Sequence, residues 1–290
     1  MGDRRGADVI AVLLALAAAL SYGFSDFFGG IVGKRVSPWS VAVTAGLGGG
    51  ALLAVLAPTG PGDPGDADLV WGAVAGVGNG FGTAFLYRGL ASGRMGVVAP
   101  VSGVTAAVLP VIVGVLSGER PASLVWAGIL VALPAIWLVA REPTAGKVSG
   151  TGSGPGSGAA DGVLAGVGFG GLFSALAQVP DSAGYWPLAI NQLVGVAVIV
   201  LIATALRTQW VPRVPIAWAG AGSGALGGLA TLAFLVSTHH GLLTVTAVLT
   251  SLYPGATVVL AAAVLKEHVH RTQLAGLAMC AVTVVCVALG

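Results

Sequence analysis

Ten apolar stretches, each close to 20 residues long, dominate this sequence. They run roughly over residues 9–31, 39–57, 69–88, 96–117, 122–140, 162–179, 185–206, 216–237, 243–265 and 272–289. One helix needs about 20 mostly apolar residues to cross the hydrocarbon core of a bilayer. The pattern therefore predicts an all-α integral membrane protein with ten transmembrane helices. The first stretch follows Arg4 and Arg5 as in a signal peptide, but it continues through Phe28, so we expect it to be retained.

Charged residues are too few for a water-facing surface. They make up 8% of the 290 residues, whereas 56% are hydrophobic. Soluble domains usually carry about 25% charged residues, so the composition excludes an ordinary soluble enzyme, a secreted disulfide scaffold and a disordered chain. The net charge of +2 and the scattered basic residues argue against a nucleic-acid partner. Cys280 and Cys286 lie in one apolar stretch and are expected to be free thiols.

The second half of the sequence resembles the first when the chain is shifted by 148 residues. The shift superposes Gly72, Gly76, Gly80, Thr83 and Glu119 on Gly220, Gly224, Gly228, Thr231 and Glu267. The aligned Glu pair is the most specific of these matches, because acidic residues are rare in this chain. Five helices per half is an odd number, so the two halves would enter the membrane from opposite sides. The sequence thus predicts two inverted five-helix repeats, an arrangement typical of transporters.

The predicted repeats are separated by a stretch of different composition. Residues 142–160 are rich in Gly, Ser and Pro, as in a flexible linker. We therefore expect the first five-helix repeat over residues 1–141 and the second over residues 161–290. Glycine recurs at every fourth position in Gly72/76/80, Gly162/166/170 and Gly220/224/228. Such stripes let neighbouring helix backbones approach closely, and a role as sliding surfaces is a second interpretation.

Five short motifs carry a resemblance to a known family. They are LSYGFSDF from Leu20, VAPVS from Val98, SGER from Ser117, SLYP from Ser251 and LKE from Leu265. With the paired repeats, they resemble the EamA-type ten-helix carriers of the drug/metabolite transporter superfamily. Members are mostly bacterial exporters or importers of amino acids, sugars, nucleosides and other metabolites. The resemblance implies a substrate cavity between the two halves that opens alternately to each side of the membrane.

Two lines of reasoning give opposite orientations. An even number of helices places both termini on one side, and most Lys and Arg residues fall on the other side. The positive-inside rule then puts the termini outside. The resemblance implies cytoplasmic termini in a multi-pass protein of the plasma (inner) membrane. We take the family topology as the expectation and keep the opposite orientation as the alternative.

Asp26 is the foremost candidate for a functional residue, because it interrupts an apolar helix after Ser21 and Ser25. An Asp at a helix centre costs about 2.5–3.5 kcal/mol on insertion scales, and intramembrane ionisable residues usually face a cavity or a partner. A carboxyl group withdrawn from water binds a proton more readily, so Asp26 is the candidate for proton coupling. The alternative is a residue near the helix end that reaches water or pairs with Lys34 or Arg35, and both interpretations stay open.

Neutral polar residues on several helices suit the lining of a hydrogen-bonding cavity. Asn79, Thr83 and Tyr87 follow an i, i+4, i+8 spacing and share one helix face. The substrate-binding candidates are Tyr22, Asp26, Asn79, Thr83, Tyr87, Ser102, Thr105, Ser174, Gln178, Asn191, Gln192, Thr250, Ser251 and Tyr253. For a single residue the alternative is an interhelical hydrogen bond, worth about 0.6 kcal/mol. We expect Arg88 to reach the membrane interface, with attraction of an anionic substrate as its alternative.

Sites for metals, cofactors and catalysis are not expected. His239-His240 and His268-Val269-His270 lack further ligands at metal spacing, so we expect solvated loop residues. A G-x-G-x-x-G match from Gly166 lies inside a membrane helix with no preceding strand, which argues against a dinucleotide. The sequence contains no Walker A, HExxH or G-x-S-x-G motif, so neither ATP-driven transport nor a hydrolase is supported.

The predicted function is that of a secondary active transporter. It would move a small polar metabolite, amino acid-like or similar, across the plasma membrane by alternating access. Export coupled to protons is one option that the sequence leaves open, and a passive channel or facilitator for small solutes is the alternative. The expected partners are a small-molecule substrate, membrane lipid and, on the proton-coupled option, protons. A monomer and a homodimer are both compatible with the sequence.

Overall fold

The fold was analysed in a computed structural model that describes residues 2–91, 95–140, 157–266 and 268–290. Within these ranges the chain is helical, and its one β-type pairing is an isolated bridge between Gly62 and Ala183. The helices are α1 (Gly2–Gly33), α2 (Pro38–Leu56), η1 (Ala57–Thr59), α3 (Asp66–Ala91), α4 (Met95–Leu116), α5 (Ser123–Ala140), α6 (Ser157–Leu176), α7 (Trp186–Ala205), η2 (Pro215–Ala219), α8 (Gly220–His240), α9 (Leu243–Thr250), α10 (Tyr253–Leu265) and α11 (Arg271–Leu289).

Within the described residues, ten helical segments are long and apolar enough to cross a membrane. They coincide with the ten predicted stretches, so the predicted all-α membrane fold is confirmed. The ninth span consists of two helices, α9 and α10. The break follows Thr250, and Pro254 lies in the first turn of α10, where its missing N–H costs no helical hydrogen bond. Pro100 and Pro110 lie inside α4, and Pro134 lies inside α5.

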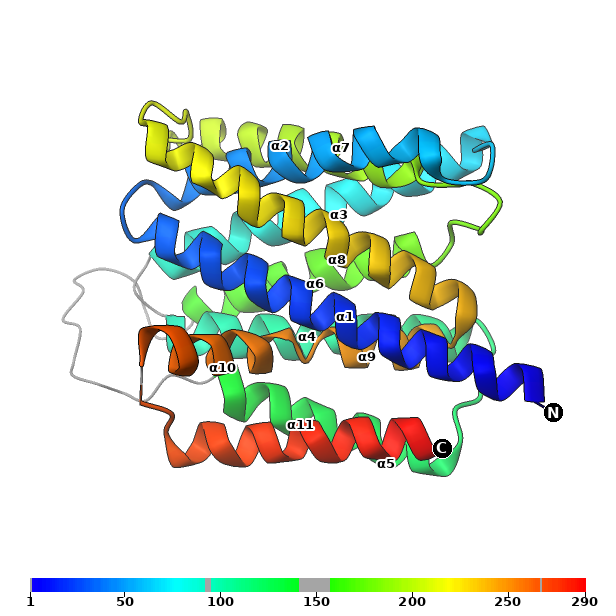
Figure 1. The fold of residues 1–290 in the computed structure, drawn as a ribbon. Helices are drawn as coiled ribbons and strands as arrows, with labels where there is room; N and C mark the ends of the chain where they lie inside the picture. Colours follow the sequence, from blue (N-terminus) through cyan, green and yellow to red (C-terminus); the bar gives the residue numbers. More distant parts are fainter. Residues whose placement is uncertain (1, 92–94, 141–156, 267) are drawn as a thin grey trace.

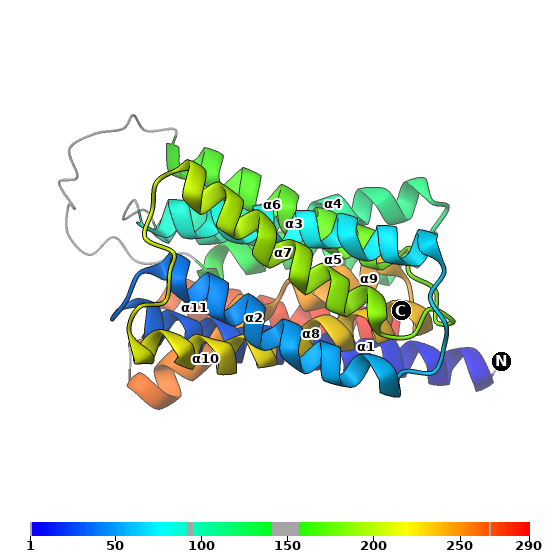
Figure 2. The ribbon, with the colours of Figure 1, turned by 90° about the horizontal axis from the view of Figure 1, so that it is seen from above.

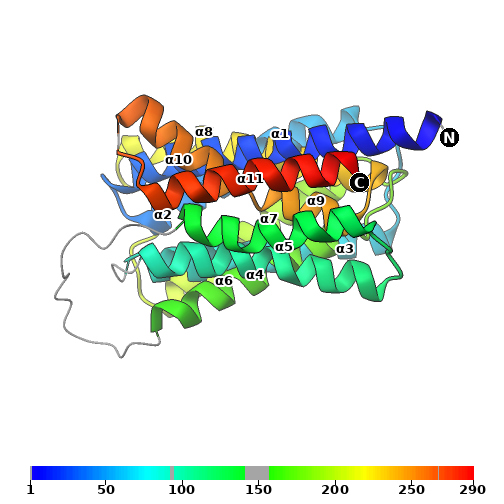
Figure 3. The same ribbon diagram turned by 90° about the horizontal axis from the view of Figure 1, so that it is seen from below.

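The helices run side by side, and both termini lie at the same end of the bundle (Figures 1, 2 and 3). We call this end the terminal side, and the end where α1 and α3 finish the distal side. The helix contacts come in matched pairs: α1 packs on α8 as α6 packs on α3, and α2 packs on α8 as α7 packs on α3. Helices α5 and α11 pack on each other (Figure 3). If spans one to five correspond in order to spans six to ten, the contact between spans one and eight corresponds to that between spans six and three. The contact between spans two and eight corresponds in the same way to that between spans seven and three. This correspondence is expected if the two halves are repeats.

The glycine stripes lie where helices approach most closely. A Cβ atom added at Gly80 on α3 would lie 2.5 Å from the carbonyl oxygen of Gly195 on α7. One added at Gly166 on α6 would lie 2.7 Å from the carbonyl oxygen of Ser102 on α4. Side chains at these positions would push the helices apart, so the predicted tight packing is confirmed.

The predicted linker lies largely outside the described residues. Residues 141–156 are not described, and α6 begins at Ser157, inside the stretch that we expected to be a linker. The predicted boundaries of the two repeats stay predictions.

Candidate functional site

A cavity of about 150 Å³ lies in the middle of the bundle. Its walls come from α1, α2, α3 and α4 before the predicted linker and from α6, α7, α8 and α10 after it. Seven of the predicted polar candidates line it: Tyr22, Asp26, Asn79, Thr83, Tyr87, Gln192 and Tyr253. The cavity thus gathers side chains from both halves of the chain.

Asp26 faces the cavity and not the lipid. Successive helical residues are rotated by about 100°, so Asp26 points about 160° away from Phe24 and Phe28. These two rings are exposed on the outer face of α1, with 38% and 46% of their surface accessible. Tyr22, one turn before Asp26, also lines the cavity. The exposure of Asp26 is therefore exposure to the cavity.

Asp26 lies well inside its span. It precedes the last residue of α1, Gly33, by seven positions, which is about 10 Å along the helix axis. Within the described part of the chain it makes no hydrogen bond or ion pair, and neither Lys34 nor Arg35 pairs with it. The pairing with Lys34 or Arg35 is therefore not seen among the described residues, and the functional role of Asp26 stays a prediction.

Two hydrogen bonds tie the cavity walls together. The hydroxyl groups of Tyr22 and Thr231 lie 2.9 Å apart, and Thr231 donates to the carbonyl of Gly227 at 2.9 Å. Because the Thr231 proton is used, Tyr22 donates to Thr231. On the other wall, Asn79 Nδ2 donates to Gln192 Oε1 at 3.0 Å. These bonds link α1 to α8 and α3 to α7, which join the two halves.

Aromatic rings form much of the remaining lining. They belong to Tyr22, Tyr87, Phe169, Phe173 and Tyr253. The ring of Tyr22 stands 6.2 Å from those of Phe173 and Tyr253, centre to centre. The cavity therefore has one carboxylate, several neutral hydrogen-bonding groups and large aromatic surfaces.

The other seven predicted candidates do not line the cavity. Asn191 is fully buried against the Gly76 region of α3. Ser102 and Thr105 lie where α4 packs on Gly166 of α6. Adjacent helical residues point about 100° apart, so Gln192 can face the cavity only if Asn191 faces elsewhere.

The remaining four lie near helix ends or in the helix break. Gln178 is exposed beyond α6 and donates to the backbone carbonyl of Ser174. Thr250 and Ser251 are fully buried at the break between α9 and α10. The buried hydroxyl groups of Ser174, Thr250 and Ser251 have no hydrogen-bond partner among the described residues, so the interhelical hydrogen bonds stated as the alternative are not seen at these positions.

Three polar residues of the lining were not predicted as candidates: Ser25, Ser223 and Thr231. Thr231 is the counterpart of Thr83 under the 148-residue shift, and that signal could have found it. Ser25 precedes Asp26 in the helix. Nothing in the sequence distinguishes Ser223, which reaches the lining because α8 packs on both α1 and α2.

The cavity is closed on the terminal side. A cluster of buried apolar residues fills the ends of four helices there, including Leu176, Val179, Leu188, Leu235 and Leu243. The lining residues lie between this cluster and the distal ends of the helices. The cluster therefore separates the cavity from the terminal side, and the lining residues lie toward the distal side.

Arg88 lies outside the cavity, at the distal end of α3. Its guanidinium pairs with Asp161 at the start of α6, with Nε 2.9 Å from Oδ1, and stands 4.4 Å from the ring centre of Phe85. Arg88 is therefore occupied by an ion pair within the protein, which argues against its role as an anchor for an anionic substrate.

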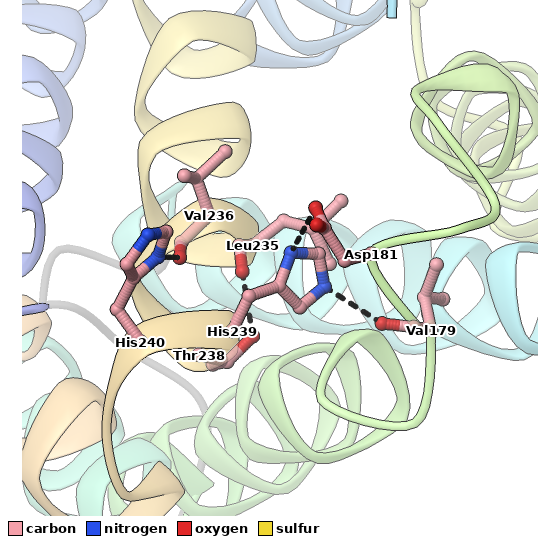
Figure 4. A network of polar contacts seen from close by, with 7 residues as sticks. All are labelled: Val179, Asp181, Leu235, Val236, Thr238, His239 and His240. Carbon is pink, nitrogen blue, oxygen red and sulfur yellow. Dashed lines mark hydrogen bonds and ion pairs between the residues drawn. The ribbon is translucent and has the colours of Figure 1, made fainter. Parts of the chain in front are cut away.

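The histidines make local contacts (Figure 4). Nε2 of His239 lies 2.8 Å from the carbonyl oxygen of Val179. Nδ1 of the same ring lies 3.3 Å from the carboxylate of Asp181. His239 and His240 form the last turn of α8, so their placement in a loop was wrong. Within the described ranges, no three His, Cys, Asp or Glu residues gather as metal ligands.

Comparison with known proteins gives a family match for the first half of the chain. Residues 9–141 match the EamA-like transporter family. A solved crystal structure, described only as that of a protein, is 19% identical with a TM-score of 0.69, and the match covers 96% of each chain. At this identity the likeness shows the fold alone. None of the curated proteins matches. The match therefore identifies residues 9–141, which hold the first five spans, as a domain of the EamA-like transporter family of the drug/metabolite transporter superfamily.

Proposed function

We propose that the protein is a secondary active transporter that moves a small polar metabolite across the plasma membrane by alternating access. The observation that carries this proposal is a cavity that is lined by polar and aromatic side chains from both halves of the chain and closed by buried apolar residues on the terminal side. A continuous pore would need no such closed end. The cavity therefore supports a carrier over the passive channel or facilitator that remains the alternative.

The matched helix contacts support two inverted repeats as the moving parts. If the halves are related, exchanging their conformations would open the terminal side and close the distal side. The apolar cluster around Leu176 and Leu243 would then separate, and an equivalent seal would form on the other side. With cytoplasmic termini, which we retain as the expectation, the present cavity faces outward. A reporter at Gly290 that is active only outside the cell would contradict this orientation.

Asp26 is the proposed coupling residue, because it is the one carboxylate among the described residues that line the cavity. Proton-coupled export would use its carboxylate as the proton-binding group.

The test is flux in proteoliposomes, with substrates chosen from metabolite profiles of cells with and without the protein. We expect saturable uptake that is stimulated by substrate on the opposite side and driven by a pH gradient. Asp26→Asn should abolish the proton-driven component and leave insertion unchanged. Flux that does not saturate and shows no trans-stimulation would contradict the carrier.

A further inference from the structure

The charge of the cavity is unbalanced. Asp26 is the one formally charged side chain in its lining, and no Lys, Arg or His from the described part of the chain joins it there. The nearby hydroxyl of Tyr22 donates its proton to Thr231, so it is not available to the Asp26 carboxylate. Arg88, which follows Tyr87 in the last part of α3, forms an ion pair with Asp161 and is not available to Asp26. A carboxylate inside a membrane span usually has a partner, and the described residues supply none.

The surroundings of this carboxylate favour a soft, weakly hydrated cation. Five aromatic rings line the same cavity, and three of them belong to tyrosines. The face of an aromatic ring attracts a cation that lies within about 6 Å of the ring centre. Tyr22 and Tyr253 present rings 6.2 Å apart, so one small cation could contact both. Ammonium groups that carry methyl or methylene substituents gain most from such surfaces, because they are poorly hydrated and also bury apolar area.

The neutral groups complete the chemistry of this site. The hydrogen bond between Asn79 and Gln192 leaves an acceptor, Asn79 Oδ1, and a donor, Gln192 Nε2, without partners in the described structure. They suit a hydroxyl group or another neutral polar substituent. A carboxylate on the ligand would find no cationic side chain in the cavity, so anions and zwitterions are disfavoured.

We propose that the cavity binds a compact organic ammonium ion, with its positive charge beside Asp26 and between the rings of Tyr22, Tyr87 and Tyr253. This inference rests on the proposed function and narrows its substrate class from polar metabolites in general to small amines and quaternary ammonium compounds. A bare inorganic cation such as Na⁺ fits less well, since it requires several oxygen ligands and gains little from apolar rings.

Binding to the purified full chain in detergent tests the proposal. Calorimetry at pH 7 would compare three ligands of similar size: choline, its neutral isostere 3,3-dimethylbutan-1-ol, and its zwitterionic relative betaine. Tetramethylammonium and methylammonium extend the cation series, and NaCl serves as the inorganic cation. We expect at least one ammonium ion to bind more than about 10-fold tighter than the neutral and zwitterionic ligands, equivalent to about 1.4 kcal/mol.

Matched variants test the residues. Asp26→Asn should remove the preference for the cation, whereas Asp63→Asn, the same change in the exposed loop after η1, should leave it unchanged. Tyr87→Leu should weaken cation binding by about 2- to 30-fold with little effect on the neutral isostere. This variant keeps the proposal testable if Asp26→Asn does not fold, which a size-exclusion profile would reveal.

The outcomes separate this inference from the transport function. Equal binding of choline and its isostere, tighter binding of betaine or Na⁺, or no binding of any ammonium ion would overturn the inference. Saturable flux of a neutral or anionic metabolite in proteoliposomes would then leave the carrier function intact. If cations bind but radiolabelled choline or tetramethylammonium shows no counterflow, the proposed carrier function is contradicted and the proposed cation-binding site is supported.

Discussion

Glu119 and Leu243 are joined by a hydrogen bond of 2.6 Å, which runs from the Leu243 amide to the Glu119 carboxylate. The second carboxylate oxygen accepts from the Thr244 amide at 3.0 Å. Glu119 lies in the turn after α4, and the two amides are the first of α9. The N-terminus of a helix has unpaired amides and a partial positive charge. Glu119, in the turn after the fourth span, therefore caps the first helix of the ninth span. This contact sits on the closed, terminal side of the cavity.

We expect Glu119→Ala to destabilise the protein by about 1–3 kcal/mol, because two amides lose a charged acceptor. Glu119→Gln should cost less, since one oxygen remains. Thermal unfolding in detergent measures both. Arg120→Gln is the control, as Arg120 is exposed one position later; an equal loss of stability for this variant would contradict the capping role.

The ion pair between Arg88 and Asp161 gives a second prediction. Arg88→Met alone leaves the largely buried Asp161 carboxylate without its partner, and we expect a loss of about 1–3 kcal/mol. Adding Asp161→Asn should recover part of this loss, because the uncompensated charge is removed. The free energies of unfolding of the two single variants and the double variant, compared with that of the original protein, give the coupling between the two residues. Additive effects of the two changes would speak against coupling.

The packing of α8 on α2 gives a third prediction. A Cβ at Gly224 would overlap the backbone of Ala45, whereas a Cβ at Gly222 meets no atom within 4 Å. Gly224→Ala should therefore lower the unfolding temperature and the yield of folded protein. Gly222→Ala should be neutral or stabilising by up to about 1 kcal/mol, because Ala favours helix more than Gly. Similar behaviour of the two variants would contradict the close approach of these helices.

Gly227 offers a way to fill the cavity without disturbing the helices. It lines the cavity, and a Cβ there would meet only the Ser25 hydroxyl, at 3.3 Å. Gly227→Val should reduce transport at least about 10-fold while the protein stays folded. Gly222→Val places the same side chain on the outer face of α8 and should transport normally. Transport assays and size-exclusion profiles of both variants give the answer, and unimpaired transport by Gly227→Val would place the substrate elsewhere.

Part of the cavity could be predicted from single helices. The spacing of Asn79, Thr83 and Tyr87 puts them on one face of α3, and all three line the cavity. Asp26 stood out because an acid is expensive inside an apolar helix. The sequence could not choose between Asn191 and Gln192, because the choice depends on which side of α7 meets α3.

Other contacts were beyond prediction because they join distant segments. The 148-residue shift marked Glu119 as unusual, but it gave no sign that its carboxylate reaches α9. Its counterpart, Glu267, lies outside the described residues. Ser102 and Thr250 were candidates because they are polar, and the fold buries them between helices.

The amino-acid sequence by itself determined that this chain is a ten-span helical membrane protein, because the lengths of its apolar stretches match the thickness of a bilayer. It also determined where helices can approach closely, because glycine has no side chain and lets the backbone of any neighbouring helix come into contact. Only the tertiary structure decided which polar side chains share a cavity and which end of that cavity is sealed. Nearly every face of such helices is apolar, so the hydrophobic pattern carries no information about which face turns inward; that choice is made by packing against helices from the other half.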